Sequence, residues 1–243
     1  MRILAINGSP RGTGGATWWV LQKFIEGAEK AGATAEVVHL AQKNIHCCTG
    51  ELACWFKTPG VCIHRDAMDE IIPLMKEADA LVLATPVYVD GMTGLLKNCI
   101  DRMVPVADPH FEIRDGHLRH PGKGSSNIRS VALVSTCGFH ELDNFDPLVA
   151  HVKAICRNLG VDYAGAVLRP AAPVFPSIPA IHPLLFRIRA IKKGIERAGS
   201  ELATAGEISE ETSEAAAAEL ISKEKYFEEA NKWFDKEGAK ANK

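Results

Sequence analysis

Short and largely continuous apolar runs recur along the first 170 residues, separated by segments with helical periodicity. Continuous runs are typical of strands that are covered on both faces of a sheet. Apolar residues three or four positions apart, as in Phe24, Ala28 and Ala31, are typical of helices with one buried face. The pattern predicts strands at 3–6, 35–40, 80–84, 131–135 and 163–168, and helices at 17–31, 66–78, 91–104 and 145–159.

The alternation of strand and helix predicts right-handed βαβ units and an α/β fold with a doubly wound parallel sheet. We expect the five strands in the order 2-1-3-4-5. The pattern stops after Leu168, where residues 169–183 carry five prolines and are expected to form an extended crossing segment. Helices are then predicted at 183–205 and 209–235. We therefore divide the chain into a sheet domain, 1–170, and a C-terminal helical extension, 171–243, packed on the domain or between subunits.

The composition argues against some classes of function and points to metal or redox chemistry as one candidate. Lys and Arg number 28 against 30 Asp and Glu, a formal net charge of −2, which argues against a basic nucleic-acid binder. No apolar run is long enough to span a bilayer, and the first residues do not resemble a signal peptide, so we expect a cytoplasmic protein without membrane or nucleic-acid partners. Four of the seven cysteines lie between Cys47 and Cys62, a clustering that suggests metal or redox chemistry in a reducing compartment.

A glycine-rich turn, residues 7–17, links the first predicted strand to the first predicted helix. Such a turn directs backbone N–H groups and the positive end of the helix dipole at an anion. Ser9 and Thr17 add hydroxyl groups, and Arg11 adds a guanidinium suited to phosphate oxygens. The turn lacks both the P-loop ending and the dinucleotide-binding pattern, and no acidic residue closes the second strand to hold a ribose. It therefore favours a ligand with one terminal phosphate.

The sequence Gly8-Ser9-Pro10-Arg11 with the following Gly and Thr resembles the phosphate loop of the NADPH-dependent FMN reductase and iron–sulfur flavoprotein families. Members usually have Asn-Thr at the end of this loop, where this chain has Ala16-Thr17. Thr85-Pro86-Val87-Tyr88 is similar to the family loop that lies along the flavin ring, and Ser135-Thr136-Cys137-Gly138 stands where a third flavin-contacting loop is found. The resemblance implies cofactor contacts by Ser9, Arg11, Gly15, Ala16, Thr17, Pro86, Val87, Tyr88, Gly91, Thr136, Cys137 and Gly138.

The resemblance also implies a fold and an activity. The expected fold is a flavodoxin-like three-layer α/β sandwich with appended C-terminal helices. The expected function is that of an FMN-dependent oxidoreductase, with NAD(P)H as donor and an unidentified small-molecule or protein acceptor. The alternative is a flavin electron-transfer protein without turnover of a small molecule. We assign no catalytic side chain, because hydride and electron transfer are chemistry of the flavin itself. Relatives of this kind imply a homodimer or homotetramer.

The cysteine-rich loop resembles the cluster loop of iron–sulfur flavoproteins but departs from its pattern. Cys48, Cys54 and Cys62 stand in register with three of the four ligands, and Glu51 stands at the other position. A four-iron cluster normally takes four thiolates, so we expect no cluster. Two alternatives stay open: a cluster with Glu51 or Cys47 as the odd ligand, and a redox disulfide or a zinc site. Zinc would add His46 or His64 to the three thiolates.

Three other segments carry residues with possible roles. The segment 108–127 contains His110, Arg114, His117, Arg119, His120 and Lys123, and is interpreted as a solvated hairpin, with a basic substrate flap as the alternative. His140 and Glu141 follow the third loop and are more consistent with a surface turn than with a substrate site. The basic stretch of the helix at 183–205 is interpreted as a solvated face.

Overall fold

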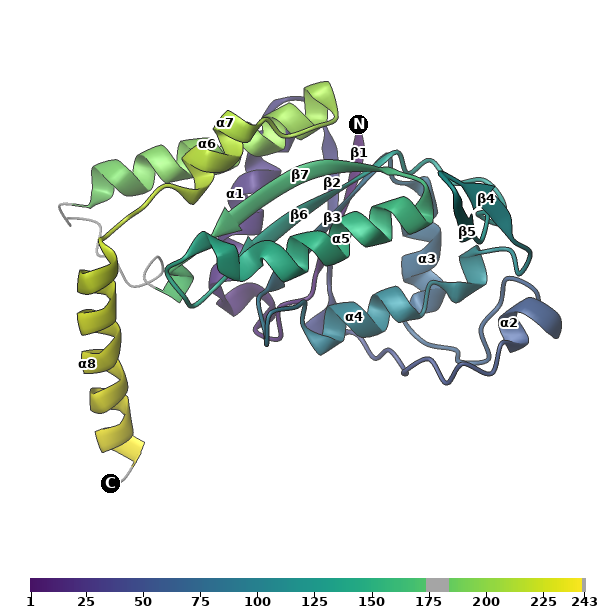
Figure 1. Cartoon of the computed structure of the whole chain (residues 1–243), viewed down its shortest axis with the longest axis horizontal. Helices are drawn as coiled ribbons and strands as arrows, with labels where there is room; N and C mark the ends of the chain where they lie inside the picture. Colours follow the sequence, from purple (N-terminus) through teal and green to yellow (C-terminus); the bar gives the residue numbers. More distant parts are fainter. Residues whose placement is uncertain (174–183, 242–243) are drawn as a thin grey trace.

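Five parallel strands form the central sheet of the protein, seen in Figure 1. The computed structural model describes residues 1–173 and 184–241. The strands lie in the order β2-β1-β3-β6-β7, and each neighbouring pair is parallel. Counted among the sheet strands alone, this is the predicted order 2-1-3-4-5. The bounds are β1 Arg2–Asn7, β2 Thr34–His39, β3 Ala80–Pro86, β6 Ser130–Thr136 and β7 Asp162–Arg169.

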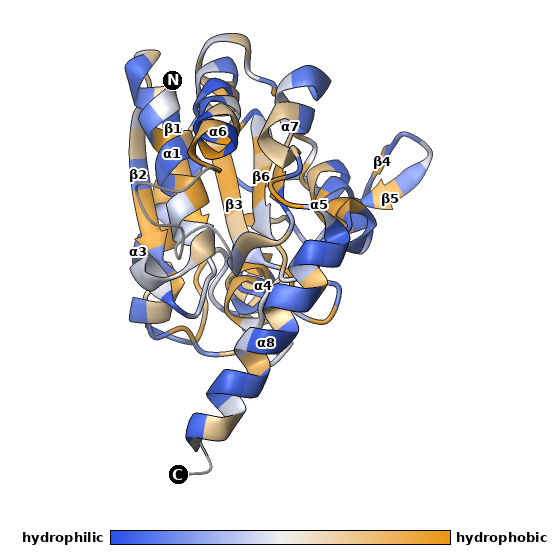
Figure 2. Cartoon of the chain, turned by 90° about the vertical axis from the view of Figure 1, so that its left-hand side faces the viewer, coloured by the Kyte–Doolittle hydropathy of each residue, from blue (hydrophilic) through white to orange (hydrophobic). Residues whose placement is uncertain are grey.

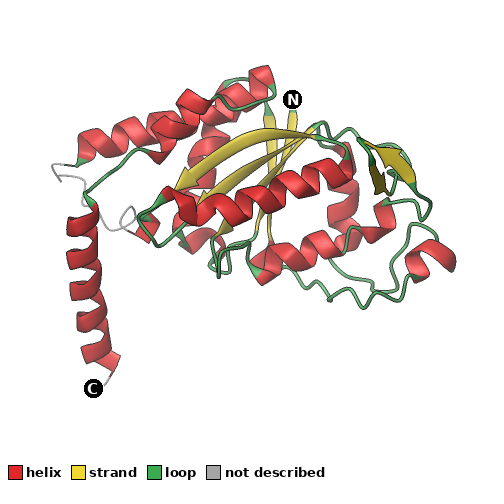
Figure 3. Cartoon of the chain, viewed as in Figure 1, coloured by secondary structure: helices red, strands yellow, loops and turns green. Residues whose placement is uncertain are grey.

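Helices cover both faces of the sheet, which confirms the three-layer sandwich (Figure 3). Successive residues of a strand point to opposite faces. Ile3 and Ala5 accordingly join the cluster under one helical layer, and Leu4 and Ile6 join the cluster under the other. One layer is formed by α1 Ala16–Lys30, α6 Leu185–Ala205 and α7 Glu210–Ala217, and the other by α3 Met68–Glu77, α4 Gly94–Asp101 and α5 Asp146–Leu159.

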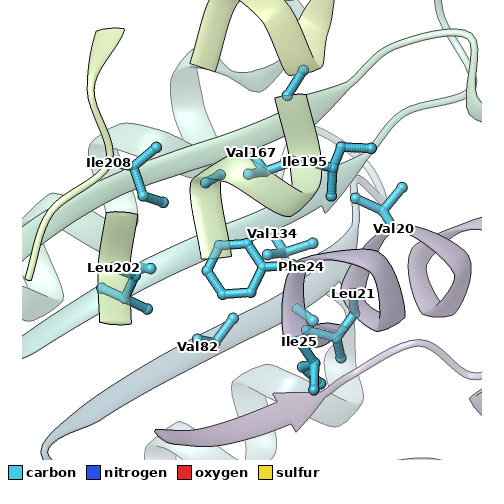
Figure 4. Packing of buried hydrophobic residues seen from close by; sticks show 14 of the residues in the cluster. Val20, Leu21, Phe24, Ile25, Val82, Val134, Val167, Ile195, Leu202 and Ile208 are labelled. Atoms are coloured by element: carbon cyan, nitrogen blue, oxygen red, sulfur yellow. The ribbon is translucent and has the colours of Figure 1, made fainter. Parts of the chain in front are cut away.

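The helix α6 packs into the core of the sheet domain, although it follows the proposed boundary at residue 170. Figure 4 shows Ile195 and Leu202 of α6 beside Phe24 of α1, above the sheet. Glycines allow the two helices to approach closely. A Cβ atom at Gly27 would lie 1.8 Å from the carbonyl oxygen of Glu196, and one at Gly199 would lie 1.9 Å from that of Phe24.

Short elements occupy the connections. Residues 108–127 contain an antiparallel hairpin in which Ile113 pairs with Leu118, both exposed. This hairpin agrees with the solvated interpretation of the segment. The remaining elements are η1 Gly12–Gly14, η2 Leu40–Gln42, α2 Ala53–Phe56, η3 Val104–Val106, β4 Glu112–Arg114, β5 His117–Arg119 and η4 Leu142–Phe145.

The prediction of one helix over 209–235 is wrong, because two helices occupy this stretch. They are α7 and α8 Lys223–Ala241, separated by a non-helical connection. The buried guanidinium of Arg169 explains the break, since its Nη1 donates to the carbonyl oxygens of Ala216 and Ala218 at 3.0 and 2.8 Å. Leu220 and Ile221 then bury their side chains in the core. Within the described ranges no helix is long and apolar enough to cross a membrane. Most of the expected proline-rich crossing segment, residues 174–183, lies outside the described residues.

Candidate functional site

Three loops meet at the carboxyl end of the sheet, where α/β proteins of this type bind ligands. The loop after β1 contacts β3 and the start of α4: the Gly8 amide donates to the Ala84 carbonyl oxygen at 2.7 Å, and Thr93 Oγ1 donates to the Gly8 carbonyl oxygen at 2.7 Å. The loop after β3 contacts the end of β6, where the Val87 amide donates to the Thr136 carbonyl oxygen at 2.8 Å. The structure thus brings together the three segments that the sequence singled out.

The first loop is held in shape by the buried side chain of Asn7. Its Nδ2 donates to the Gly12 carbonyl oxygen at 3.1 Å, and its Oδ1 accepts from the Ser9 amide at 3.0 Å. Ser9 is also buried, and its Oγ accepts from the Arg11 amide at 3.3 Å. The reversal at Gly12 has a φ of +54°, a conformation that favours glycine. Asn7 was not among the predicted site residues, although its place at the end of β1 pointed to it.

The N-terminus of α1 is open toward this loop. Its N-cap residue is Gly15, and among the described residues no side chain caps it and no acidic residue lies in the first turn. The first N–H groups of a helix have no partner within the helix. A Cβ at residue 15 would lie 3.2 Å from Arg11 Cβ and 3.4 Å from Ser9 Oγ, so glycine keeps the space between these side chains free. The arrangement has the properties of a small anion site.

Thr17 has a different environment from the one expected of a phosphate ligand. The residue is buried, and its Oγ1 lies 2.7 Å from Thr136 Oγ1, so the two hydroxyls form a hydrogen bond that joins the first loop to the third. Thr17 therefore contributes its hydroxyl to the contact between loops, while its place in the first turn of α1 agrees with the expected phosphate position.

The second loop ends in a tight, strained turn. The amides of Tyr88 and Gly91 donate to each other's carbonyl oxygens at 3.0 and 3.2 Å, and between them Val89 and Asp90 have φ angles of +47° and +61°. A β-branched residue rarely adopts this conformation, and such strain concentrates at binding sites. Tyr88 keeps half of its surface exposed, at 51%. The loop thus leaves an aromatic side chain half exposed just after the carboxyl end of β3.

The third loop contains the thiol of Cys137, which is held neutral. Burial raises the pKa of Cys137, and its Sγ accepts from the Phe139 amide at 3.3 Å. The Tyr226 hydroxyl at the start of α8 donates to the Gly138 carbonyl oxygen. A protonated, buried thiol is a poor nucleophile, so Cys137 is suited to packing and not to covalent chemistry. The C-terminal region thereby touches the candidate site, a contact that no motif indicated.

Asn7 determines the protonation state of His39, which lies at the end of β2. His39 Nδ1 lies 3.0 Å from Asn7 Nδ2, an atom that can only donate, so the imidazole accepts there and is neutral. Burial lowers the pKa of His39, which agrees with this assignment. The ring also meets Trp18 edge-on at 4.8 Å. His39 is a second residue that sequence analysis missed at this site.

The cysteine-rich loop is anchored at the far end of α4, away from the three loops. Asn98 Nδ2 donates to the Ile45 carbonyl oxygen, and Arg102 Nη1 donates to the His46 carbonyl oxygen and to Asp66, both at 2.7 Å. Burial by itself would raise the pKa of Asp66, but hydrogen bonds from Arg102 and from backbone amides hold it well below its usual range. This buried ion pair fixes the loop.

The residues present do not fit a four-iron cluster. Cys54 is buried and its pKa is raised, mainly by that burial, whereas Cys48 is exposed. Thr49 Oγ1 donates to the Glu51 carboxylate at 2.6 Å. Within residues 1–173 and 184–241, no group of three or more His, Cys, Asp or Glu could hold a metal ion. The absence of a cluster stays a prediction, and no step is derived through one.

Other predicted residues take part in packing. His140 Nε2 lies 2.9 Å from the Ile221 carbonyl oxygen, and Glu141 pairs with Lys223 at 2.5 Å, so both hold the C-terminal region. Burial raises the pKa of Cys99 to about 12 and that of Cys156 to about 11, as expected of inert core thiols. In the basic stretch of α6, Arg197 pairs with Glu201 and Glu211.

Curated proteins share only part of this chain. An iron-sulfur flavoprotein of Archaeoglobus fulgidus is 42% identical over 105 residues, which cover 43% of this chain and 46% of the relative. An iron-sulfur flavoprotein of Methanocaldococcus jannaschii is 39% identical over 106 residues, 44% of this chain and 53% of the relative. The chain thus spans about half the length of these curated relatives.

Solved structures are similar over more of the chain. An FMN-dependent NADH-azoreductase of Bacillus anthracis, solved with FMN, superposes with a TM-score of 0.61 at 22% identity, covering 84% of this chain and 99% of the other. An NAD(P)H:quinone oxidoreductase of Methanothermobacter marburgensis gives a TM-score of 0.58 at 17% identity, covering 83% and 96%. At these identities the likeness shows the fold, which is flavodoxin-like as expected.

The family match itself comes from the profile of the NADPH-dependent FMN reductases, which covers residues 1–140. This range contains all three loops of the candidate site and ends two residues after Gly138. It also exceeds half of the 243-residue chain. The chain therefore belongs to the NADPH-dependent FMN reductase family.

Proposed function

We propose that this protein is an FMN-dependent oxidoreductase that takes electrons from NAD(P)H. The observation that carries the proposal is the meeting of three loops at the uncapped N-terminus of α1, all within the residues that match the family. The open N–H groups, the Ser9 hydroxyl and the Arg11 guanidinium together suit one phosphate group. The exposed ring of Tyr88 and the adjacent backbone suit a flat aromatic ligand.

The proposed contacts divide between the two ends of FMN. In this assignment one set holds the phosphate and a second set lines the ring. The phosphate set comprises Ser9, Arg11, Gly15, Ala16 and Thr17. The ring set comprises Pro86, Val87, Tyr88, Gly91, Thr136, Cys137 and Gly138.

Bound FMN would supply the hydride and electron transfer, and the chain would bind, orient and shield it. Two titratable side chains at these loops agree with a passive role. Cys137 is held protonated by burial, and the Nδ1 atom of His39 is engaged with Asn7. We therefore assign no side-chain acid or base. The backbone and hydroxyl groups of the three loops hold the ligand in place.

One observation favours a second function, that of an electron-transfer protein. Relatives that are about 40% identical to this chain are named iron-sulfur flavoproteins, which suggests electron transfer between proteins in place of small-molecule turnover. The acceptor would then be a protein. In either case we propose a homodimer or homotetramer in the cytoplasm, with no nucleic-acid partner.

One experiment separates the two functions. FMN-loaded protein is mixed with NADPH or NADH without oxygen, and the flavin absorption near roughly 450 nm, a property of the cofactor, is followed. Rapid bleaching, followed by repeated turnover when a quinone or azo dye is added, supports the oxidoreductase. Bleaching by dithionite but not by either nucleotide would contradict the proposed donor and favour the electron carrier. Free FMN at the same concentration is the control.

A further inference from the structure

The C-terminal helix α8 projects from the body of the protein and carries a stripe of exposed aromatic side chains. Figures 1 and 2 show it leaving the sandwich beside the carboxyl end of the sheet and continuing away from the other helices. Phe227, Trp233 and Phe234 are 68%, 57% and 62% exposed. Together with Ala230 they lie on one side of the helix, because their spacings of three, four and seven residues match its period.

The first turns of α8 are tied to the body. The Tyr226 hydroxyl donates to the Gly138 carbonyl oxygen, the ring lies 6.0 Å from that of His140, and Lys223 pairs with Glu141 at 2.5 Å. These contacts fix the root of the helix beside the third loop of the candidate site. A contiguous set of exposed aromatic side chains marks an interaction surface.

We propose that α8 pairs antiparallel with the α8 helix of a second copy of this chain. The charges of the helix favour this partner. Residues 223–231 carry three glutamates and two lysines, of which Lys223 pairs with Glu141, whereas residues 232–241 carry three lysines and two acidic residues. An antiparallel pair places the acidic half of each helix against the basic half of the other. A membrane surface is disfavoured, because the five lysines of α8 are balanced by five acidic residues, whereas helices that bind anionic lipid carry an excess of Lys and Arg.

Side-chain size also fits the antiparallel pair. If the two helices overlap fully, the two-fold axis passes near residue 232, the midpoint of Lys223–Ala241. Phe234 then lies opposite Ala230 of the other copy, in both directions, so that a large side chain meets a small one. The two Trp233 side chains lie on either side of the axis.

The area that α8 alone could bury is too small for a stable interface, so the contact between the two copies must extend to the body of the protein. A helix of this length spans about 28 Å, and its three aromatic side chains would bury roughly 300–450 Å² per copy, given their size. A stable interface needs about 800 Å² per partner. In the antiparallel pair, the end of one α8 reaches the root of the other, where Phe139 and Leu142 are 65% and 48% exposed. The second copy thus adds to the wall of the candidate site.

Sedimentation equilibrium of the full-length, FMN-loaded protein tests this pairing. We expect the wild-type protein to form a dimer or tetramer. In the Phe227→Ser/Phe234→Ser variant, the dissociation constant of the dimer should rise at least tenfold. The Lys225→Ser/Glu228→Ser variant changes the opposite, polar face of the same helix without changing the net charge of either half, and it should leave the constant unchanged. The replaced aromatic groups are exposed, so the fold should be retained, with unchanged circular dichroism. A monomeric wild type, or unchanged association in the aromatic variant, would overturn the pairing.

Crosslinking tests the direction of the pair. Under oxidation, Trp233→Cys should form a disulfide-linked dimer, because the two positions lie about 3 Å apart along the axis. Phe227→Cys should not exceed the wild-type background, because its two positions lie about 15 Å apart along the axis. Equal crosslinking at both positions would indicate a parallel pair and contradict the proposal.

Neither association measurement depends on catalysis, so failure of the pairing would leave the flavin assignment standing. The alternative partner of the aromatic stripe is a lipid surface, and binding to vesicles of phosphatidylcholine and phosphatidylglycerol tests it. Binding to them that is lost in the Phe227→Ser/Phe234→Ser variant would assign the stripe to a lipid surface and overturn the proposal.

Discussion

Gly15 shows how one residue leaves a helix open to an anion. Most helix N-termini are closed by a serine, threonine, aspartate or asparagine. Here the N-cap residue has no side chain, and the neighbouring Ser9 and Arg11 lie so close that a Cβ at residue 15 would touch both. The candidate residues on this loop could be singled out from sequence because glycine, hydroxyl and guanidinium groups share a short turn, and their contact with a ligand stays a prediction. Asn7 and His39 were missed because their roles depend on a contact between two strands.

Loss of the Arg11 guanidinium should weaken FMN binding. Arg11→Ala removes one charged hydrogen-bond donor, which is worth roughly 1.5–3 kcal/mol. The dissociation constant for FMN, measured by quenching of flavin fluorescence, should rise about 10- to 150-fold at that energy. Lys43→Ala, a substitution of an exposed cation that pairs with Glu70, serves as the control and should change little. Equal FMN affinity in Arg11→Ala would contradict the phosphate assignment.

Acidic pH should weaken the first loop through His39. Its pKa is lowered in the folded protein, so the neutral form contributes stability above its unfolded value of about 6.5. That contribution is lost as the pH falls from there toward the lowered pKa, because protonation places a donor against Asn7 Nδ2. FMN affinity should therefore fall between about pH 7 and pH 5.

His39→Gln, which keeps an acceptor but does not titrate, tests this assignment. FMN affinity in this variant should depend less on pH than in the wild type over the same range. Identical pH profiles of the two proteins would show that His39 is not the group responsible.

At the scale of elements, the strand order was expected from the common doubly wound topology, and hydrophobic periodicity predicted every sheet strand, because buried parallel strands leave continuous apolar runs. It failed at the C-terminus for a physical reason. Residues 209–235 have helical composition throughout, but the helix ends where Arg169 takes up the carbonyl groups of Ala216 and Ala218. Such a long-range contact leaves no local signal. The close approach of α1 and α6 could not be predicted from the sequence either, since a glycine within a helix does not by itself indicate a helix crossing.

A methyl group at the crossing of α1 and α6 should destabilise the whole fold. Gly199→Ala places a Cβ within 1.9 Å of the Phe24 carbonyl oxygen, so the helices must separate. Overpacking of this kind costs about 3 kcal/mol of unfolding free energy. Gly94→Ala in α4, where nothing lies within 4 Å of the added Cβ, is the matched control and should not destabilise the fold. Chemical denaturation measures both, and equal stabilities would contradict the packing.

At the scale of the whole molecule, the family resemblance singled out the three loops of the candidate site but not the segments that contact them. The three loops are found within residues 1–140, as their motifs predicted. The contact of Tyr226 with Gly138, and the position of α8, come from a region beyond the family match. The cysteine-rich loop is anchored elsewhere, by hydrogen bonds from Asn98 and Arg102 at the C-terminal half of α4 and just beyond it.

We predict that protein purified without oxygen contains no intact four-iron cluster. Three cysteines stand at the family positions, while Glu51 occupies the fourth and is bound by Thr49. A carboxylate is a harder ligand than a thiolate and suits a cluster iron poorly. Iron and acid-labile sulfide should both be far below one per chain. About four of each, the content of one cluster, would show that an unusual ligand completes the set.

The central claim is that the open N-terminus of α1 binds the phosphate of FMN. Calorimetric titration of the flavin-free protein with FMN and with riboflavin, which differ only by this phosphate, tests it most directly. We predict one FMN bound per chain, riboflavin bound at least tenfold more weakly, and a smaller difference between the two ligands in Arg11→Ala. Equal affinity of the wild-type protein for both ligands would contradict the account.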